Sequence, residues 1–431
     1  MNTSVQKCDR FGNPIDPHVG YARGSILRSS YEETLRLAQA RVVIRNRLTK
    51  HGDRSIALFT GNQRDFPVRK EDLAVFCEEW IGPALFEDDL RDAILEHLGG
   101  RDHHAVAVFN RTSAGIVAAI AALAAKGLVI SVAPPKTKSH ASVIRGAELA
   151  GCSFLEVHSA EETAEHTSAS DLRLIVITSV SSSLDSFSDA DIAAVVSAAR
   201  KSNASILIDD AYGARMRPVL HKGRKSLEFD VDLAISNADK SGLEGPRAGF
   251  MAGEPELVGR VQAKAAELGQ EARAPIAVGV LRALQRYTPR LLLDEVAHGR
   301  DLADALVKRL GDAIVKRTDI GPMVTEEDIL TNLLTRGRSR DQPPSVVPCE
   351  ASSALGMFLL EDHGMLTVNV CGQPGAKVSL RLKPTGDALE RLGGANAIAE
   401  AVEHGLDRTA KIVNDESSVA ATVLGNREVR A

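Results

Sequence analysis

One lysine followed by four glycines stands out in the stretch "SNADKSGLEGPRAGFMAG", residues 236–253. The amine of Lys240 could attack a carbonyl carbon and, once released, could accept or donate a proton. The glycines after it allow the backbone to turn tightly and to approach other groups closely. Taken alone, Lys240 could equally be a solvated loop residue, so its meaning depends on the polar groups that the fold places beside it.

Two other polar groups directly follow apolar runs. "ILIDDAYGARM" carries Asp209 and Asp210 at its centre, and "VAVFNRTSAGIVAAI" carries Thr112, Ser113, Ala114 and Gly115 at the start of a helical pattern. Neighbours on a strand face opposite ways, so only one of the two carboxylates should point into a site, and if buried it needs a cationic partner. Free N–H groups and hydroxyls at a helix start suit a phosphate, although the same residues also cap helices without a ligand.

The elements that must position these residues form a pattern of β-branched runs alternating with helical stretches. This pattern predicts an α/β fold in which helices cover both faces of a mostly parallel, seven-stranded sheet, a three-layer arrangement. Ligands bind beyond the carboxyl ends of such strands, where Lys240 and Asp209 would lie. The strands are expected at residues 104–110, 127–133, 153–158, 172–180, 204–210, 231–236 and 248–253.

The chain is long enough to divide into lobes, because 431 residues with 44% hydrophobic side chains can bury more than one core. We expect an N-terminal arm at 1–100, the large α/β domain at 101–288, a smaller α+β domain at 289–412 and a tail at 413–431. A long helical stretch is expected at 255–287. In the smaller domain, strands are expected at 364–370 and 377–384.

A phosphate cradle, a planar stacking residue, a carboxylate at a strand tip and a later lysine form the set that holds pyridoxal 5'-phosphate (PLP). In this arrangement Lys240 would form the Schiff base and Asp209 would keep the pyridine nitrogen protonated. His140 lies just before a helix at residues 139–150, where a histidine is more often a surface or capping residue than a catalytic one.

These motifs resemble those of the fold-type-I PLP-dependent enzymes, and within them the branch of bacterial selenocysteine synthase and its archaeal look-alikes. The resemblance covers roughly residues 100–290. It implies that Lys240 is the cofactor lysine, Asp209 the pyridinium partner and His140 the stacking ring, with Thr112, Ser113, Ala114 and Gly115 as the phosphate loop. It also implies at least a homodimer.

Further residues are expected to contact the substrate. By the same resemblance Arg381, on the strand 377–384, would grip the substrate carboxylate, the alternative being a surface salt bridge. Tyr212 either lines the pocket or packs against the strand, and Arg247 is a pocket or interface residue.

Composition excludes other classes of function. The formal net charge of −5 does not indicate a nucleic-acid-binding protein, although residues 1–54 carry a net charge of +5, and no apolar run indicates a membrane segment or a secretory signal. The five cysteines have no metal-type spacing, so no metal site is expected, and a reducing cytoplasm is the expected location.

Three functions follow from this interpretation. The favoured one is a PLP-dependent lyase that abstracts the α-proton of a small amino acid or amino-sugar acid and then eliminates or replaces a group at Cβ, with Lys240 as acid and base. The alternatives are a selenium transferase acting on seryl-tRNA and a PLP-binding protein without turnover.

Overall fold

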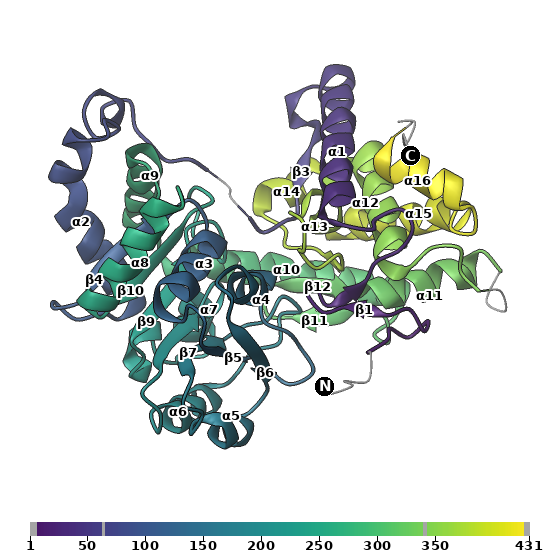
Figure 1. Ribbon diagram of the computed structural model, residues 1–431. Coiled ribbons are helices and arrows are strands. Elements are labelled where there is room, and N and C mark those ends of the chain that lie inside the picture. Colours follow the sequence, from purple (N-terminus) through teal and green to yellow (C-terminus); the bar gives the residue numbers. More distant parts are fainter. Residues whose placement is uncertain (1–6, 63–64, 339–342, 426–431) are drawn as a thin grey trace. The chain divides into compact units, whose positions relative to one another are not determined.

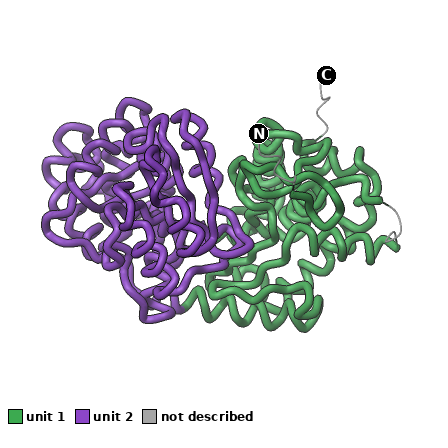
Figure 2. Tube along the Cα trace, turned by 60° about the horizontal axis from the view of Figure 1, so that its bottom comes forward, with its two compact units in different colours: residues 1–61, 294–431 green, residues 62–293 purple. Residues whose placement is uncertain are grey.

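The computed structural model describes residues 7–62, 65–338 and 343–425, and it divides into two compact units (Figure 2). Unit 1 comprises residues 1–61 and 294–431, and unit 2 comprises residues 62–293. This division differs from the expected one, in which residues 1–100 formed one arm. The first 61 residues belong with the C-terminal part because strand β3 (Ala57–Leu58) pairs in parallel with β13 (Met365–Leu366).

Unit 2 contains the predicted seven-stranded sheet, and all seven strands lie at the predicted places (Figure 1). Their order is β4-β10-β9-β8-β7-β5-β6. Strand β10 is antiparallel to both β4 and β9, whereas the remaining neighbours pair in parallel. Six strands therefore end at the same edge. The strands are β4 (Ala105–Phe109), β5 (Leu128–Val132), β6 (Ser153–Val157), β7 (Leu172–Thr178), β8 (Ser205–Asp209), β9 (Leu233–Asn237) and β10 (Gly249–Gly253).

Alternation along the strands explains why helices cover both faces of this sheet. Successive residues of a strand point to opposite faces, and here both sets are apolar. Val129 and Leu174 pack against α3, α4 and α8, whereas Ile130 and Ile175 pack on the other side with α2, α6 and α9. The helices of unit 2 are α2 (Ile81–Leu98), α3 (Thr112–Leu123), α4 (Ala141–Leu149), α5 (Ala160–His166), α6 (Asp189–Ala199), α7 (Gly213–Leu220), α8 (Pro255–Glu267) and α9 (Ala274–Arg286).

The long helical stretch predicted at 255–287 is two helices, α8 and α9. Helix α8 ends before Gly269, which has a positive φ of 62°, and Pro275 lies in the first turn of α9. A left-handed glycine and an N-terminal proline are an ordinary end and start of helices. The amphipathic pattern of the sequence continues from α8 into α9, so the pattern alone predicted one helix where Gly269 and Pro275 mark an end and a new start.

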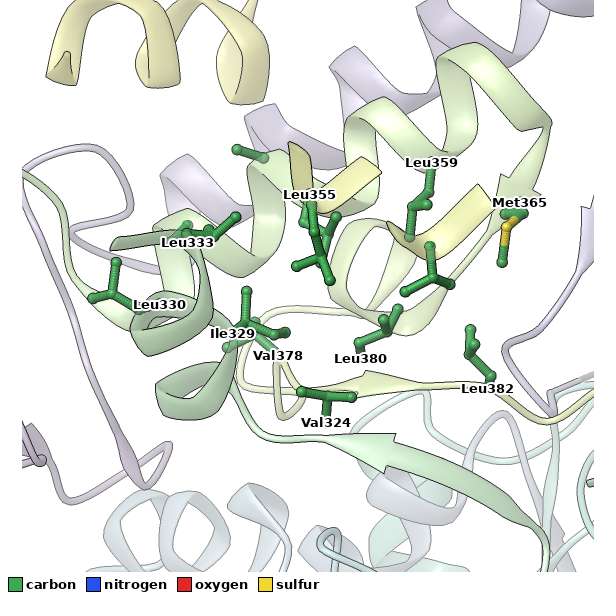
Figure 3. Packing of buried hydrophobic residues seen from close by; sticks show 14 of the residues in the cluster. Val324, Ile329, Leu330, Leu333, Leu355, Leu359, Met365, Val378, Leu380 and Leu382 are labelled. Carbon is green, nitrogen blue, oxygen red and sulfur yellow. The ribbon is translucent and has the colours of Figure 1, made fainter. Parts of the chain in front are cut away.

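Unit 1 combines helices with a small antiparallel sheet, as expected for an α+β domain. Its core is shown in Figure 3, where Leu355 and Leu359 of α12 lie near Leu380 and Val324 of the sheet. The helices are α1 (Ser30–His51), α10 (Pro289–Leu310), which continues from unit 2, α11 (Glu326–Arg336), α12 (Pro348–His363), α13 (Val368–Cys371), α14 (Gly386–Arg391), α15 (Ala395–Ala410) and α16 (Glu416–Leu424). The remaining strands are β1 (Ile15–Asp16), β2 (Tyr21–Ala22), β11 (Lys316–Thr318), β12 (Gly321–Val324) and β14 (Leu380–Arg381).

Three expectations for unit 1 need correction. The strand predicted at 364–370 is only β13 followed by the short helix α13, because the Asn369 side chain donates to the carbonyl of Ser352 (2.7 Å) and tertiary contacts override the β-branched pattern. The strand predicted at 377–384 is confined to β14. The tail contains helix α16, which buries Val419 and Val423 in the core, while residues 426–431 lie outside the described part of the chain.

None of the helices within the described residues is both long enough and apolar enough to cross a membrane.

Candidate active site

The common edge of the sheet in unit 2 brings three of the predicted motifs together. Asp209 ends β8 and lies opposite Ile235 of β9. Gly249 of β10 pairs with Asn237 of β9 on one side and with Phe109 of β4 on the other. The loop that carries Lys240 and the start of helix α3 therefore flank the same point of β10.

The two neighbouring aspartates have different surroundings, as the alternation predicted. Asp210 is fully buried and accepts hydrogen bonds from Arg217 Nη1 (3.0 Å) and Nη2 (2.5 Å), from Ser226 Oγ (2.6 Å) and from Ser179 Oγ. Burial by itself raises the pKa of Asp210, but the charge of Arg217 and these hydrogen bonds lower it overall. Asp210 is therefore an ionised structural residue whose cationic partner is Arg217.

Asp209 is also buried, and the groups that stabilise its charge are the backbone N–H of Ala211 and Lys240. Its Oδ1 atom is shielded from solvent and has no hydrogen-bond partner among the described residues. Burial raises the pKa of Asp209 to about 6, against the attraction of Lys240, which lowers it. A buried carboxylate oxygen without a partner is costly, so this atom is suited to a donor that the chain itself does not supply. The protonated pyridine nitrogen of PLP is such a donor.

Lys240 follows β9 in a strained turn. The N–H of Leu243 donates to the carbonyl of Lys240 (3.1 Å), and both Ser241 (φ 53°) and Gly242 (φ 78°) adopt left-handed conformations. A Cβ on Gly242 would lie 2.6 Å from the backbone nitrogen of Leu292, so this position requires glycine. The Nζ atom of Lys240 lies 4.6 Å from the centre of the Tyr212 ring, which places the buried Tyr212 beside the amine.

A buried arginine joins the loop that follows Asp209 to the strand that leads to Lys240. Arg215 Nη2 donates to the carbonyl of Ala211 (3.1 Å) and to Asn237 Oδ1 (2.9 Å), and its Nη1 lies 3.3 Å from Ser236 Oγ. These bonds fix the spacing of two strand ends that carry the candidate catalytic groups.

Helix α3 presents an open N-terminus. It begins at Thr112 after an N-cap residue, Arg111, whose side chain makes no capping bond. The N–H groups of Ala114 and Gly115 bond to the carbonyl of Arg111, whereas those of Thr112 and Ser113 have no partner among the described residues. Free N–H groups at a helix start are a ready anion site.

Two glycines allow this helix start to lie against the sheet. A Cβ on Gly249 would lie 2.6 Å from the nitrogen of Thr112, and one on Gly115 would lie 2.5 Å from Ile235 Cδ1. Gly115 is thus needed for close packing of α3 against the sheet.

Sequence reasoning assigned no role to Arg111 and left Arg247 without a defined one. Arg247 Nε lies 3.6 Å from Asp239 Oδ2. Burial lowers the pKa of Arg111, the charge of Arg247 lowers it further, and Asp239 raises it. Arg247 thus pairs with Asp239, and the charge of Arg111, directly before the α3 N-terminus, adds an excess of positive charge that suits a phosphate dianion. The position of Arg111 directly before the helix start was the signal in the sequence.

His140 is the N-cap of α4, as the capping alternative predicted. Its Nδ1 accepts the N–H of Ser142 (3.2 Å) and lies 2.8 Å from Ser142 Oγ, which fixes the ring orientation. Arg381 lies in unit 1 on β14, where its Nη2 donates to the carbonyl of Lys377 (3.1 Å).

Comparisons with known proteins agree with this geometry. The sequence profile of "Aminotransferase class I and II" matches residues 81–387. A "UPF0425 pyridoxal phosphate-dependent protein" of Methanothermobacter thermautotrophicus is 32% identical over 403 residues, which cover 93% of this chain and 100% of that protein.

Two solved structures have the same fold at low identity. The aspartate aminotransferase of Thermotoga maritima has a TM-score of 0.54 at 15% identity, covering 85% of this chain and 97% of that one. A methionine aminotransferase of Escherichia coli has a TM-score of 0.55 at 15% identity, covering 91% and 100%. The profile match and the 32% identical relative show the family, and the buried Asp209 oxygen fits its cofactor. The chain belongs to the class I and II aminotransferase family, with the fold-type-I α/β architecture, and is a PLP-dependent enzyme.

Proposed function

We propose that Lys240 carries the cofactor and moves the proton at the Cα atom of a small amino-acid-like substrate. The observation that carries this proposal is the buried Asp209 Oδ1, which has no hydrogen-bond partner among the described residues and whose carboxyl group feels the charge of Lys240. When bound, PLP supplies an aldehyde that links to amines and a pyridine ring that withdraws electrons from the substrate carbon.

Each group in unit 2 has a place in this proposal. Asp209 would hold the pyridine N–H, and the N–H groups of Thr112 and Ser113, with Arg111 and Arg247, would hold the phosphate. The ring of His140, fixed by its capping bonds, would pack against the cofactor ring.

We propose that Lys240 acts as the base. The face of Tyr212 lies 4.6 Å from its Nζ and attracts the protonated amine, which keeps the side chain near one position while it gains and loses a proton. The strained turn at Ser241 fixes the backbone from which the side chain extends. Lys240 can then accept the proton from Cα and donate it to another atom of the substrate.

We propose elimination or replacement at Cβ of a small amino acid or amino-sugar acid as the overall reaction, with Arg381 binding the substrate carboxylate. Transamination is the second candidate, which the match to the aminotransferase profile favours. Product analysis separates the two. Elimination releases the Cβ substituent together with ammonia and a keto acid, and replacement exchanges that substituent while the amine stays; transamination leaves Cβ unchanged and passes the amine to a keto acid acceptor.

The attachment point is tested by reducing the native protein with borohydride and mapping its peptides by mass. We expect the pyridoxyl group on Lys240, and none in Lys240→Ala. Lys264→Ala is the matched control, since Lys264 pairs with Glu267 on the surface of α8 and should not affect labelling. A pyridoxyl group on another lysine, or none in the native protein, contradicts the proposal.

The remaining alternatives need different assays. A selenium transferase related to selenocysteine synthase would bind tRNA, with the basic residues of α1 as its contact; a salt-sensitive gel shift with tRNA would favour that reaction over ours. A protein without turnover would leave every amino acid in a panel unchanged. We also propose a homodimer, and light scattering that finds a monomer at full cofactor occupancy would oppose it.

A further inference from the structure

Two histidines of unit 1 meet at the end of helix α12. His363 is the last residue of α12, and His404 lies on α15. His363 Nε2 lies 3.1 Å from His404 Nδ1, and the two ring planes are 89° apart. Together with Asp362, they offer one ligand atom each within 4.8 Å of one another. None of these residues belongs to the cofactor site.

The distances suit a transition metal. At a Zn–N bond length of about 2.0–2.1 Å, two ligands of a tetrahedral zinc ion are separated by about 3.3 Å, close to the separation of these two nitrogens.

Asp362 supplies the second, independent observation. Its Oδ2 atom is buried and has no hydrogen-bond partner among the described residues. Its Oδ1 atom accepts from Arg408 Nη1, so the carboxylate is already oriented. An oriented carboxylate with one oxygen bonded and the other unsatisfied is the usual arrangement of a metal ligand held by a neighbouring side chain.

A second cluster of possible metal ligands, formed by His103, His104 and Glu254 in unit 2, differs from the first in the hydrogen bonds of its rings. His104 Nε2 and His103 Nε2 each lie 3.7 Å from Glu254 Oε1. However, His104 Nδ1 accepts the N–H of Arg101 (3.1 Å), so the proton of the neutral ring is on Nε2. That nitrogen has no lone pair for a metal unless the backbone bond breaks. The facing nitrogens of His363 and His404 bond to each other instead, so a metal ion that displaces the shared proton can bind both.

The charges around the first cluster nearly balance. Arg408 also pairs with Glu361 (2.8 Å), and Arg47 Nη1 donates to the carbonyl of Glu361 (2.7 Å). Two arginines thus face two carboxylates, which leaves the site without a net charge to repel a cation. His404 lines a surface cavity between α15 and α16, through which an ion and a coordinating water can reach the site.

We propose that Asp362, His363 and His404 form a zinc site that links the end of α12 to α15, with water as the fourth ligand. Such a site stabilises unit 1 whenever the metal is bound, because the ion binds the folded protein and not the unfolded chain. The site is independent of the function proposed for unit 2.

The test uses the PLP-loaded protein, stripped of metal and titrated with Zn²⁺ against a competing chelator dye. We expect one zinc ion per chain at this site, and at least about a 100-fold loss of affinity in His404→Gln and in His363→Gln. His103→Gln is the matched control and should bind as the native protein does. Equal affinity in all four proteins, or no binding by the native protein, overturns the proposal and leaves the two rings as a hydrogen-bonded pair.

Cu²⁺ as a probe keeps the test valid if a variant fails to fold. Electron paramagnetic resonance of the native protein with one equivalent of Cu²⁺ should show coupling to two imidazole nitrogens. The His103→Gln variant should give the same spectrum. Coupling to one nitrogen or none in the native protein would refute the assignment without any variant.

Discussion

Replacing Asp209 with Asn should stabilise the cofactor-free protein at neutral pH, although it removes a catalytic residue. The pKa of Asp209 is raised from 3.8 to about 6, so the folded protein holds this proton more tightly than the unfolded chain does. The native protein therefore loses stability as the pH rises from about 4 to about 6, and the loss then stays constant. The difference between the two pKa values corresponds to about 3 kcal/mol. Asn carries no charge, so the variant escapes this loss.

Urea unfolding of both cofactor-free proteins, followed by circular dichroism between pH 4 and pH 8, measures this difference. The variant and the native protein should be equally stable at pH 4, and the variant should be more stable by about 3 kcal/mol at pH 8. Hydrogen exchange of the β8 amides reports on unit 2 separately. The same variant should bind PLP more weakly, because the pyridine N–H loses its carboxylate partner.

Asp210→Asn is the matched control, one residue away. It removes the partner of the buried Arg217 and should destabilise the protein at neutral pH by about 3–5 kcal/mol. The pKa of Asp210 is lowered, so its contribution is present above the ordinary value of 3.8 and disappears only as the pH falls through the lower folded value. If Asp209→Asn destabilised the cofactor-free protein at pH 8, or if its effect did not vary with pH, the assignment of Asp209 as a buried carboxylate with a raised pKa would be wrong.

Two further predictions concern the same unit. Gly213→Ala would place a Cβ 2.1 Å from Asp210 Oδ1 and should lower the stability in thermal unfolding by at least about 1–3 kcal/mol. Gly259→Ala on α8 is the control: its Cβ meets nothing within 4 Å, so it should raise the stability by up to about 1 kcal/mol. Equal effects would mean that the Asp210 network is loosely packed. Arg247→Gln should weaken PLP binding at least about tenfold in a fluorescence titration. The affinity for pyridoxal, which lacks the phosphate, should not change. An equal loss of affinity for both ligands would mean that Arg247 does not bind the phosphate.

The sheet and its strand ends could be predicted because their signal is local. Each strand is a short β-branched run, and the parallel arrangement then brings Lys240 and Asp209 to one edge. Alternation also predicted that the two aspartates differ. What the sequence could not reveal were pairings that the packing decides. Arg217, only seven residues after Asp210, reaches it through the turn into α7, and the charges of Arg111 and Arg247 come close because β10 inserts between β4 and β9.

Element ends and short elements were harder to predict, because single contacts decide them. The strand expected at 364–370 became α13 through hydrogen bonds of Asn369, and helix α1 has Ser29 as its N-cap although Ser30 and Glu33 also have capping-box spacing. Ser29 Oγ donates to Glu32 (2.6 Å), and the pair Ser29 and Glu32 has the same three-residue spacing as the pair Ser30 and Glu33. Two overlapping capping patterns in one stretch cannot be distinguished without the fold.

The pairing of β3 with β13 has a consequence for synthesis on the ribosome. Unit 2 is a continuous segment that can fold once residue 293 has emerged, whereas residues 1–61 must wait for strand β13, more than 300 positions later, before their own partner exists. Throughout that interval Ile26, Leu27 and Phe59, which the folded protein buries in the core of unit 1, lack the partners that later residues supply. The nascent chain therefore exposes these apolar side chains until β13 has been made, and we expect chaperones to bind it most while the last third of unit 1 is being translated.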